Sequence, residues 1–196
     1  RETEESNEQT EPDEDATPRK EFGTLFHLFR ELSARHSPRG HLAPERMDAL
    51  TTPLTADEKK EIAVAFADFW KGPSGSAVKK APKCFPELPF IYKTRHGILK
   101  GQLDLVYREQ DGGWVILDYK TNRLAGKKER EAAVETYRPQ LGLYALAFWK
   151  LYGEVPKKTV LYFTAFHEAV EVEWTRAELE KLELELDGWY RKALDF

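Results

Sequence analysis

Apolar residues recur at helical spacing in the first part of the chain. In residues 22–32 they fall at positions 22, 25, 26, 29 and 32, a stripe typical of an amphipathic helix. Residues 55–72 open with Thr55 and Glu58 at capping-box spacing and close on a glycine, which predicts a second helix. Three prolines between these helices indicate irregular chain, and residues 73–84, rich in Gly, Ser, Lys and Pro, predict a loop.

Further along the chain, the spacing of apolar residues changes to every second position. Three β-rich runs, at residues 87–94, 98–109 and 114–121, are separated by the turn sequences RHG and QDGG, which predicts an antiparallel meander. The remaining elements are a helix, two strands and a last helix, at residues 127–152, 159–167, 169–174 and 175–194. This order predicts a mixed α/β domain with a central sheet flanked by helices.

Charge divides the chain unevenly. The formal net charge of the 196 residues is −4, but residues 1–20 hold eight acidic and three basic residues, which leaves +1 for residues 21–196. The first 20 residues have no aromatic residue and no aliphatic one larger than alanine, so we expect an acidic disordered linker or tail before a single domain over 21–196. The first residue is Arg rather than Met, which suits a fragment of a longer protein or equally a trimmed expression product.

Several classes of protein are excluded. No run approaches the 18 apolar residues of a membrane span, and the N-terminal region does not resemble a signal peptide. The single cysteine, Cys84, excludes an internal disulfide, an all-cysteine zinc site and a four-cysteine iron–sulfur cluster. A reducing, cytoplasmic setting is therefore expected.

The candidate chemistry lies at the end of the run WVILDYKTNR. Because side chains alternate across a strand, Trp114, Ile116, Asp118 and Lys120 share one face. A carboxylate and an ammonium thus lie side by side where an apolar strand ends. They could form a surface ion pair or half of an active site.

The hairpin before this strand brings in a second carboxylate. If residues 109–113 form its loop, Arg108 faces Trp114, and Asp104 lies opposite Asp118 with Cβ atoms about 4.5–5.5 Å apart. Two like charges there are unfavourable unless a cation lies between them, and a divalent cation with oxygen ligands is the natural candidate. A one-residue slip would send Asp104 to the other face.

A solvated strand face, with Lys120 as a simple partner of Asp118, is the alternative, and for Asp104 alone it is the more usual case. The strand around Asp118 is otherwise apolar on both faces, which indicates burial, and a buried charge needs a partner or a metal.

The segments GQLDLVY, WVILDYKT and YRPQLGLYALAF, in this order, resemble the RecB-type nucleases of the PD-(D/E)XK superfamily, and most of all the C-terminal nuclease domain of AddA/RecB-type helicase–nucleases. The resemblance runs from about residue 22 to about residue 165. It implies a restriction-endonuclease-like core. Some relatives carry a four-cysteine iron–sulfur cluster, which this chain cannot form.

The resemblance implies a metal site. Asp104, Asp118 and the backbone carbonyl of Tyr119 would bind one or two Mg²⁺ or Mn²⁺ ions, and His27 would complete the site. A single helical histidine is more often a packing residue, and Glu31, one turn later, could orient its ring but more simply is a surface charge.

Lys120 would lie beside the attacking water, help position or deprotonate it, and stabilise charge on the phosphate. The reaction would be in-line hydrolysis of a phosphodiester bond, with Lys120, Asp118 and Asp104 as its catalytic residues. Glu87, in ELPF, matches an acid found before the first strand of such domains and could support the metal site.

The helix after these strands would complete the site. Tyr137, Gln140 and Tyr144 fall at i, i+3 and i+7 on one helix face. Core packing explains the tyrosines, but a glutamine on that face indicates a polar contact, and the family uses this Gln and Tyr beside its active site.

Basic residues flank the strands and suit a DNA backbone, although scattered solubilising lysines are the usual explanation. They are Lys79, Lys80, Lys83, Lys93, Arg95, Lys100, Arg123, Lys127, Lys128 and Arg130. No sequence-reading module is visible, so we expect cleavage with little base preference.

The resemblance implies the nuclease module of a helicase–nuclease that processes double-strand breaks in recombinational repair. Its partners would be DNA, a helicase motor in the same parent chain and a partner nuclease subunit, in the bacterial cytoplasm at the nucleoid. The alternatives are a stand-alone defence or mobile-element nuclease, and a catalytically silent nuclease fold that binds DNA ends or a partner subunit.

Overall fold

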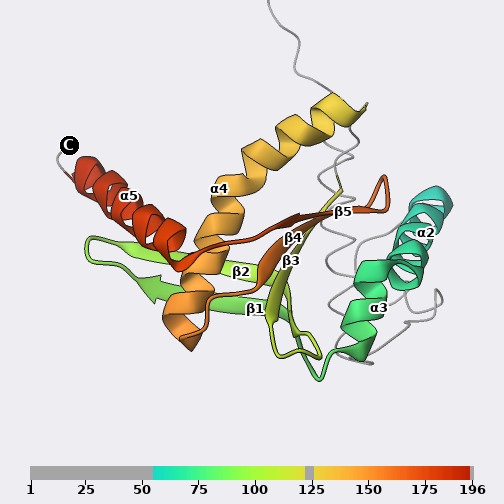
Figure 1. Ribbon diagram of the computed structural model, residues 1–196. Coiled ribbons are helices and arrows are strands. Elements are labelled where there is room, and N and C mark those ends of the chain that lie inside the picture. The colour runs from blue at the N-terminus through green and yellow to red at the C-terminus, as the bar shows by residue number, and fades with distance from the viewer. Residues whose placement is uncertain (1–54, 122–125, 195–196) are drawn as a thin grey trace, which may run out of the picture.

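A single five-stranded sheet forms the centre of the computed structural model, which describes residues 55–121 and 126–194 (Figure 1). The strands are β1 Lys83–Lys93, β2 Ile98–Arg108, β3 Trp114–Lys120, β4 Lys158–Phe163 and β5 Glu168–Val172. The helices are α2 Ala56–Lys71, α3 Pro73–Lys80, α4 Lys127–Tyr152 and α5 Arg176–Leu194. The predicted helix at 22–32 and the acidic tail at 1–20 lie outside the described residues.

Strand order in the sheet follows the chain, β1-β2-β3-β4-β5. Neighbouring strands are antiparallel except β3 and β4, which are parallel and joined by α4 as a crossover. The meander predicted for the first three strands and the mixed α/β class are therefore confirmed.

The two faces of the sheet are covered by different helices. Val115 and Leu117 of β3 pack with residues of α2 and α3, whereas Ile116 packs with Phe148 of α4. The side chains of β3 alternate as predicted, and all residues from Val115 to Tyr119 are buried. The charged side chain of Asp118 in this strand therefore lies in a buried environment.

The predicted hairpin loop at 109–113 is confirmed. The Glu109 N–H donates to the Gly113 carbonyl at 2.8 Å. Arg108 pairs with Trp114, and the pairing continues in the same register to Leu105 with Leu117. This register aligns the acidic positions of β2 and β3.

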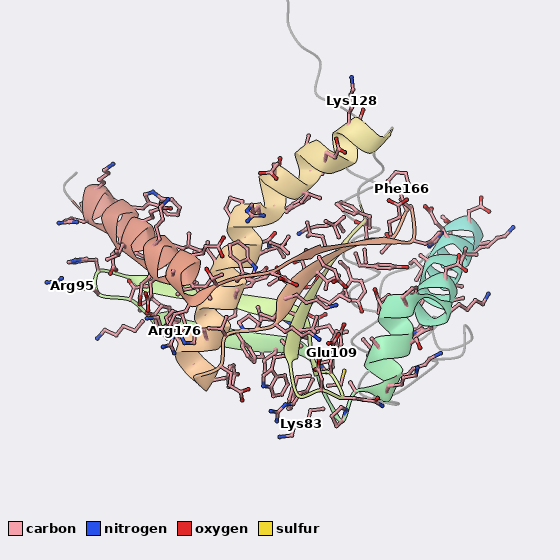
Figure 2. The ribbon with its side chains drawn as sticks, in the orientation of Figure 1. Lys83, Arg95, Glu109, Lys128, Phe166 and Arg176 are labelled. Atoms are coloured by element: carbon pink, nitrogen blue, oxygen red, sulfur yellow. The ribbon has the colours of Figure 1, made fainter. Side chains whose placement is uncertain are left out.

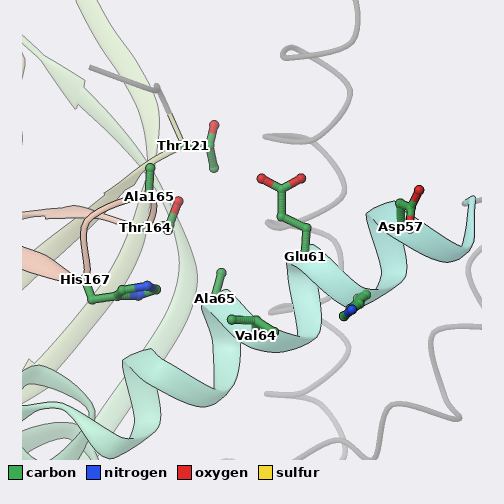
Figure 3. Close-up of a pocket in the computed structure, with 9 residues that line it drawn as sticks. Asp57, Glu61, Val64, Ala65, Thr121, Thr164, Ala165 and His167 are labelled. Atoms are coloured by element: carbon green, nitrogen blue, oxygen red, sulfur yellow. The ribbon is translucent and has the colours of Figure 1, made fainter. Parts of the chain in front are cut away.

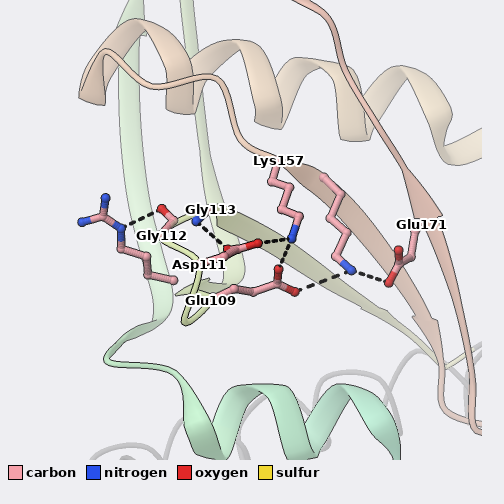
Figure 4. Close-up of polar contacts among 8 residues, drawn as sticks. Glu109, Asp111, Gly112, Gly113, Lys157 and Glu171 are labelled. Atoms are coloured by element: carbon pink, nitrogen blue, oxygen red, sulfur yellow. Dashed lines mark hydrogen bonds and ion pairs between the residues drawn. The ribbon is translucent and has the colours of Figure 1, made fainter.

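Ion pairs tie this hairpin to the start of β4 (Figure 4). Lys157 Nζ lies 2.6 Å from both Glu109 Oε2 and Asp111 Oδ2, and Lys158 Nζ lies 2.5 Å from Glu171 Oε1. Hydrogen bonding to Asp111 and Glu109 raises the pKa of Lys157, and hydrogen bonding to Lys157 lowers the pKa of Asp111. The cluster fixes the end of the sheet where β3 begins, away from Asp118.

The predicted loop at residues 73–84 is wrong. Pro73 begins α3, where its missing N–H costs nothing, and Val78 packs into the core against α2. Gly75 makes this close approach possible, since a Cβ there would lie 2.2 Å from the Phe69 carbonyl oxygen. Composition indicated a loop, but tertiary packing overrides propensity here.

Two glycine-to-alanine changes in helices are expected to act in opposite directions. Gly75→Ala should lower the free energy of unfolding by about 1–3 kcal/mol, because its methyl group collides with the α2 backbone. Gly188→Ala in α5 should raise it by about 0.5–1 kcal/mol, since that Cβ meets nothing within 4 Å. Denaturant unfolding of both variants measures this, and equal effects of the two changes would contradict the packing of α3.

The capping box predicted for the last helix is confirmed. The Glu178 N–H donates to Thr175 Oγ1, and the Thr175 N–H donates to Glu178 Oε2 at 2.8 Å. These bonds lower the pKa of Glu178. Among the described residues, no helix has the length and apolar character needed to cross a membrane.

Candidate active site

Asp118 and Lys120 form an ion pair at the end of β3. Lys120 Nζ lies 2.8 Å from Asp118 Oδ2, with 14% of the lysine side chain and 3% of the aspartate side chain exposed. Removing a carboxylate from water is costly unless a cation or hydrogen bonds compensate. The pair predicted from the sequence is therefore a buried one, and the solvated strand face is excluded for Asp118.

Helix α4 holds the ammonium of Lys120 from the other side. Lys120 Nζ donates to Gln140 Oε1 at 3.0 Å and lies 4.2 Å from the centre of the Tyr137 ring. Gln140 Nε2 in turn donates to the Tyr144 hydroxyl at 2.7 Å. The three α4 residues therefore share one face toward Lys120, and the glutamine makes the polar contact that its position predicts.

Tyr144 lies among the acidic groups. Burial raises its pKa to about 12, and the charges of Asp118, Asp104 and Glu87 add to the effect. The hydroxyl therefore stays protonated at neutral pH and keeps its place in the chain of hydrogen bonds. Its ring also packs edge-on against Phe90, so it serves the core as well.

Asp104 meets β3 through its side chain rather than through the strand ladder. Backbone pairing of β2 with β3 ends at Leu105 and Leu117, one position before Asp104 and Asp118. The Tyr119 N–H instead donates to Asp104 Oδ2 at 2.8 Å. The predicted register is confirmed as far as the ladder runs, and continued by one position it sets Asp104 opposite Asp118.

The backbone at the end of β3 is fixed on both sides. The N–H and C=O of one strand residue point to the same side, so the Tyr119 carbonyl points toward β2 and Asp104. On the opposite side the Thr164 N–H donates to the Lys120 carbonyl at 2.9 Å. The Tyr119 ring packs against Phe69 on the α2 face, which anchors the Asp-Tyr-Lys segment.

Glu87 lies across from Asp104 on the next strand. The β1–β2 ladder pairs Pro86 with Leu105 and Leu88 with Leu103 but omits the pair between them, Glu87 and Asp104, and Glu87 has a φ of 49°. A non-glycine residue in this region is strained and often marks a functional position. Acids on three successive strands are thereby aligned in one row.

Two residues that the sequence interpretation did not single out support this row. Gln102 Nε2 donates to Glu87 Oε2 at 2.6 Å, and Thr164 binds the Lys120 carbonyl. Gln102 lies two positions before Asp104, and Thr164 directly follows a buried strand, as Lys120 ends another. A search for polar residues at strand ends would have found Thr164.

The candidate metal donors fit a hard cation. Carboxylate and carbonyl oxygens, here from Asp104, Asp118 and Tyr119, are the ligands that Mg²⁺ and Mn²⁺ prefer. Within residues 55–121 and 126–194, no three His, Cys, Asp or Glu side chains gather as a metal-binding group. His27 and Arg123, two further predicted site residues, lie outside the described part of the chain.

A cavity of about 300 Å³ lies near the end of β3 but on the other face of the sheet (Figure 3). Its lining includes Glu61 and Val64 of α2, together with Thr121, Thr164 and His167. None of the candidate catalytic residues lines it. The candidate site is thus built on the α4 face and is separate from this cavity.

Comparison with known proteins gives the family. The model of the PD-(D/E)XK nuclease superfamily matches residues 2–195. The chain is 32% identical over 130 residues to an ATP-dependent helicase/nuclease subunit of Clostridium perfringens strain SM101, covering 56% of this chain and 10% of that protein. It is 28% identical over 136 residues to the corresponding ATP-dependent helicase/nuclease protein of Clostridium novyi, covering 61% and 11%.

A solved structure supports the fold alone. A protein from Eubacterium rectale with a provisional exonuclease assignment superimposes with a TM-score of 0.56 at 11% identity, covering 95% of this chain and 68% of that one. The chain spans about a tenth of the length of the curated relatives above. With the family model matching nearly the whole sequence, the chain belongs to the PD-(D/E)XK nuclease superfamily.

Proposed function

We propose that this chain is a metal-dependent deoxyribonuclease that hydrolyses phosphodiester bonds of DNA at the end of β3. The observation that carries the proposal is the ammonium of Lys120, held between Asp118 and Gln140, with the carboxylate of Asp104 bound to the backbone N–H of the intervening Tyr119. A buried acid, an adjacent base and a second acid on the next strand form a set of groups suited to phosphoryl chemistry.

Asp104, Asp118 and the Tyr119 carbonyl would hold Mg²⁺ or Mn²⁺. A bound divalent cation supplies a water of lowered pKa and neutralises charge on the phosphate oxygens. Glu87, across from Asp104, would support this site, with its own carboxylate held by the bond from Gln102. His27 remains a further candidate ligand from outside the described residues.

Lys120 would act on the phosphate and on the water. Its ammonium would bind a non-bridging phosphate oxygen and orient the attacking water, while Gln140 and Tyr137 keep it in position. Tyr144 would fix the amide of Gln140 so that its oxygen faces Lys120. These side chains come from β3 and α4, two rigid elements, which suits a preorganised site.

The curated relatives suggest the setting. Both matched proteins are described as parts of ATP-dependent helicase/nucleases and are about ten times longer than the matched part. We therefore propose that this domain is the nuclease module of a helicase–nuclease, tethered to a motor that delivers unwound DNA and paired with a partner nuclease subunit. Its role would be end processing in recombinational repair.

A cleavage assay on the purified chain tests the activity. Supercoiled plasmid and a labelled linear single strand are incubated with EDTA, Mg²⁺ or Mn²⁺. We expect degradation with either cation and none with EDTA. Undiminished cleavage in EDTA would contradict metal dependence. No cleavage with either cation, together with no binding of DNA or metal, would contradict the nuclease proposal.

The pH dependence of cleavage should be insensitive to Tyr144. Because the pKa of Tyr144 is raised from 10.0 to about 12, its phenol stays protonated through about pH 10, whereas an ordinary tyrosine would be half ionised there. Tyr144→Phe removes the acceptor of Gln140 Nε2 and should lower kcat/KM about tenfold, from the cost of an unsatisfied amide. Plots of kcat/KM against pH for the wild type and the variant should run parallel from about pH 7 to 10. A change in slope near pH 10 that only the wild type shows would contradict this account.

A further inference from the structure

We propose that the exposed face of the β1–β2 hairpin binds single-stranded DNA. This inference rests on the proposed function and names a further surface that binds its substrate. The surface belongs to the distal ribbon, defined as residues 88–93 of β1 with their partners 98–103 of β2. It extends away from the rest of the sheet beneath α4 and α5 (Figure 1).

One side of the distal ribbon is held firmly. Leu88, Phe90 and Tyr92 pack toward α4, and the Tyr190 hydroxyl of α5 donates to the Ile98 carbonyl at 2.7 Å. Tyr92 also donates to Glu183 of α5. The ribbon is thus a supported platform whose other side is left for a ligand.

The other side consists entirely of exposed residues. Side chains of an antiparallel pair share a face, so Pro89 with Gln102, Ile91 with Lys100, and Lys93 with Ile98 form one surface. All six residues are exposed, Ile91 at 71% and Ile98 at 57%. These six residues form two rows of three, called the grid below. Cations and large aliphatic side chains alternate within it.

The charge on this surface has one sign. Lys93, Lys100 and Arg95, the last in the turn at the ribbon tip (Figure 2), engage in no ion pair with any described residue, and none of the six grid residues is acidic. In contrast, Lys150 and Lys157 are each paired with carboxylates at 2.6 Å. A polyanion is the complementary ligand.

The surface ends at the row of acids. Gln102, at the inner end of the grid, donates to Glu87, which lies across from Asp104. From Glu87 to Lys93 the strand extends about 20 Å, at 3.3–3.4 Å per residue. The grid lies on the face of the sheet away from α4, whereas Lys120 lies on the α4 face, so a strand bound along the grid reaches only the edge of the site, at Glu87.

The aliphatic residues favour a single strand over a duplex. Unpaired bases offer apolar faces next to their phosphates, whereas a duplex stacks these faces inside. Ile91 and Ile98 alternate with Lys100 and Lys93, so the grid offers both kinds of contact at once. We infer little base preference, because neither an aliphatic side chain nor a lysine–phosphate contact reads a base edge.

The test compares two double charge reversals in the whole chain. Lys93→Glu/Lys100→Glu removes the cations of the grid, and Lys60→Glu/Lys71→Glu makes the same change of charge on exposed residues of α2, outside the distal ribbon. Binding of a labelled single strand, and of a labelled duplex of the same length, is followed by fluorescence anisotropy in EDTA, so that no cleavage occurs. Thermal melting checks that each variant is folded.

We expect the grid variant to bind at least about tenfold more weakly at about 50 mM salt, with a slope of log K against log salt reduced by about 1.4, or 0.7 for each lost phosphate contact. The control should stay within about twofold with an unchanged slope. Equal losses of affinity in both variants would show that only the net charge of the protein matters, and would overturn the inference.

Other outcomes separate this inference from the proposed function. A grid variant that binds like the wild type, while the wild type cleaves DNA, overturns the inference and leaves the nuclease intact. A wild type that neither binds nor cleaves overturns both. A grid variant that loses only duplex binding also contradicts the inference, because a single strand is its stated ligand.

Discussion

Lys120→Ala is expected to reduce the rate of DNA cleavage by about 10²–10³-fold or more, the cost of removing one preorganised donor from a transition state. The ammonium of Lys120 is bound by Asp118 and Gln140 and lies over Tyr137, so its loss removes a positioned positive charge from the site. Single-turnover cleavage at saturating protein measures the effect on the chemical step. Lys120→Ala also leaves Asp118 without its ammonium, so melting is measured alongside with Mn²⁺ present.

Lys158→Ala is the matched control. Lys158 is as buried as Lys120, at 16% against 14% side-chain exposure, and it too is paired with carboxylates, but it begins β4 at the other end of the sheet. We expect this variant to keep its cleavage rate within about threefold, as its ion pairs serve structure. A Lys120→Ala protein that is folded and fully active would contradict the catalytic role of Lys120.

The second large effect is on stability. Phe69→Ala should lower the free energy of unfolding by about 3–5 kcal/mol, because the side chain is 1% exposed and its removal leaves a cavity. The Phe69 ring meets Trp70, Tyr119 and Tyr162 edge-on, with centroids 5.0–5.3 Å apart. Because Tyr119 connects the two charged residues of the site, we expect cleavage to fall as well. Urea unfolding measures the loss of stability.

Phe85→Ala makes the same chemical change where the ring is 44% exposed and contacts Trp114. We expect this variant to lose less than about 1.5 kcal/mol, since much of its ring is already in water. Similar losses in both variants would contradict the burial of Phe69 between α2 and the sheet.

The elements with regular spacing could be predicted from sequence. Alternation over residues 114–121 and helical spacing over 127–152 correspond to β3 and α4 within a residue, and the hairpin loop follows from its turn sequence. Helix α3 could not be predicted, because its stability comes from Val78 and Gly75 packed against α2 rather than from helix-forming residues. The first four residues of β1, 83–86, were missed because Pro86 and the preceding Pro82 favour a loop.

The candidate site was predictable where it depends on the regular spacing of residues along a strand or a helix. Alternation places Asp118 and Lys120 side by side, and helical spacing places Tyr137, Gln140 and Tyr144 on one face. What depends on backbone irregularity was not predictable.

The interruption of both ladders at Asp104 has no signature in the amino-acid pattern. The positive φ of Glu87 and the bond from Gln102 follow from the path of β1 and β2 through space, which no local window of sequence contains.

The measurement that tests the central claim most directly is cleavage of a labelled single strand by wild type and Asp118→Asn with Mn²⁺ present. The amide has the shape of the carboxylate but no charge to bind a cation or Lys120. We predict metal-dependent degradation by the wild type and a loss of at least about 10³-fold in the variant, with an unchanged fold by circular dichroism. A folded Asp118→Asn protein that cleaves like the wild type would contradict the claim that the end of β3 is the nuclease centre.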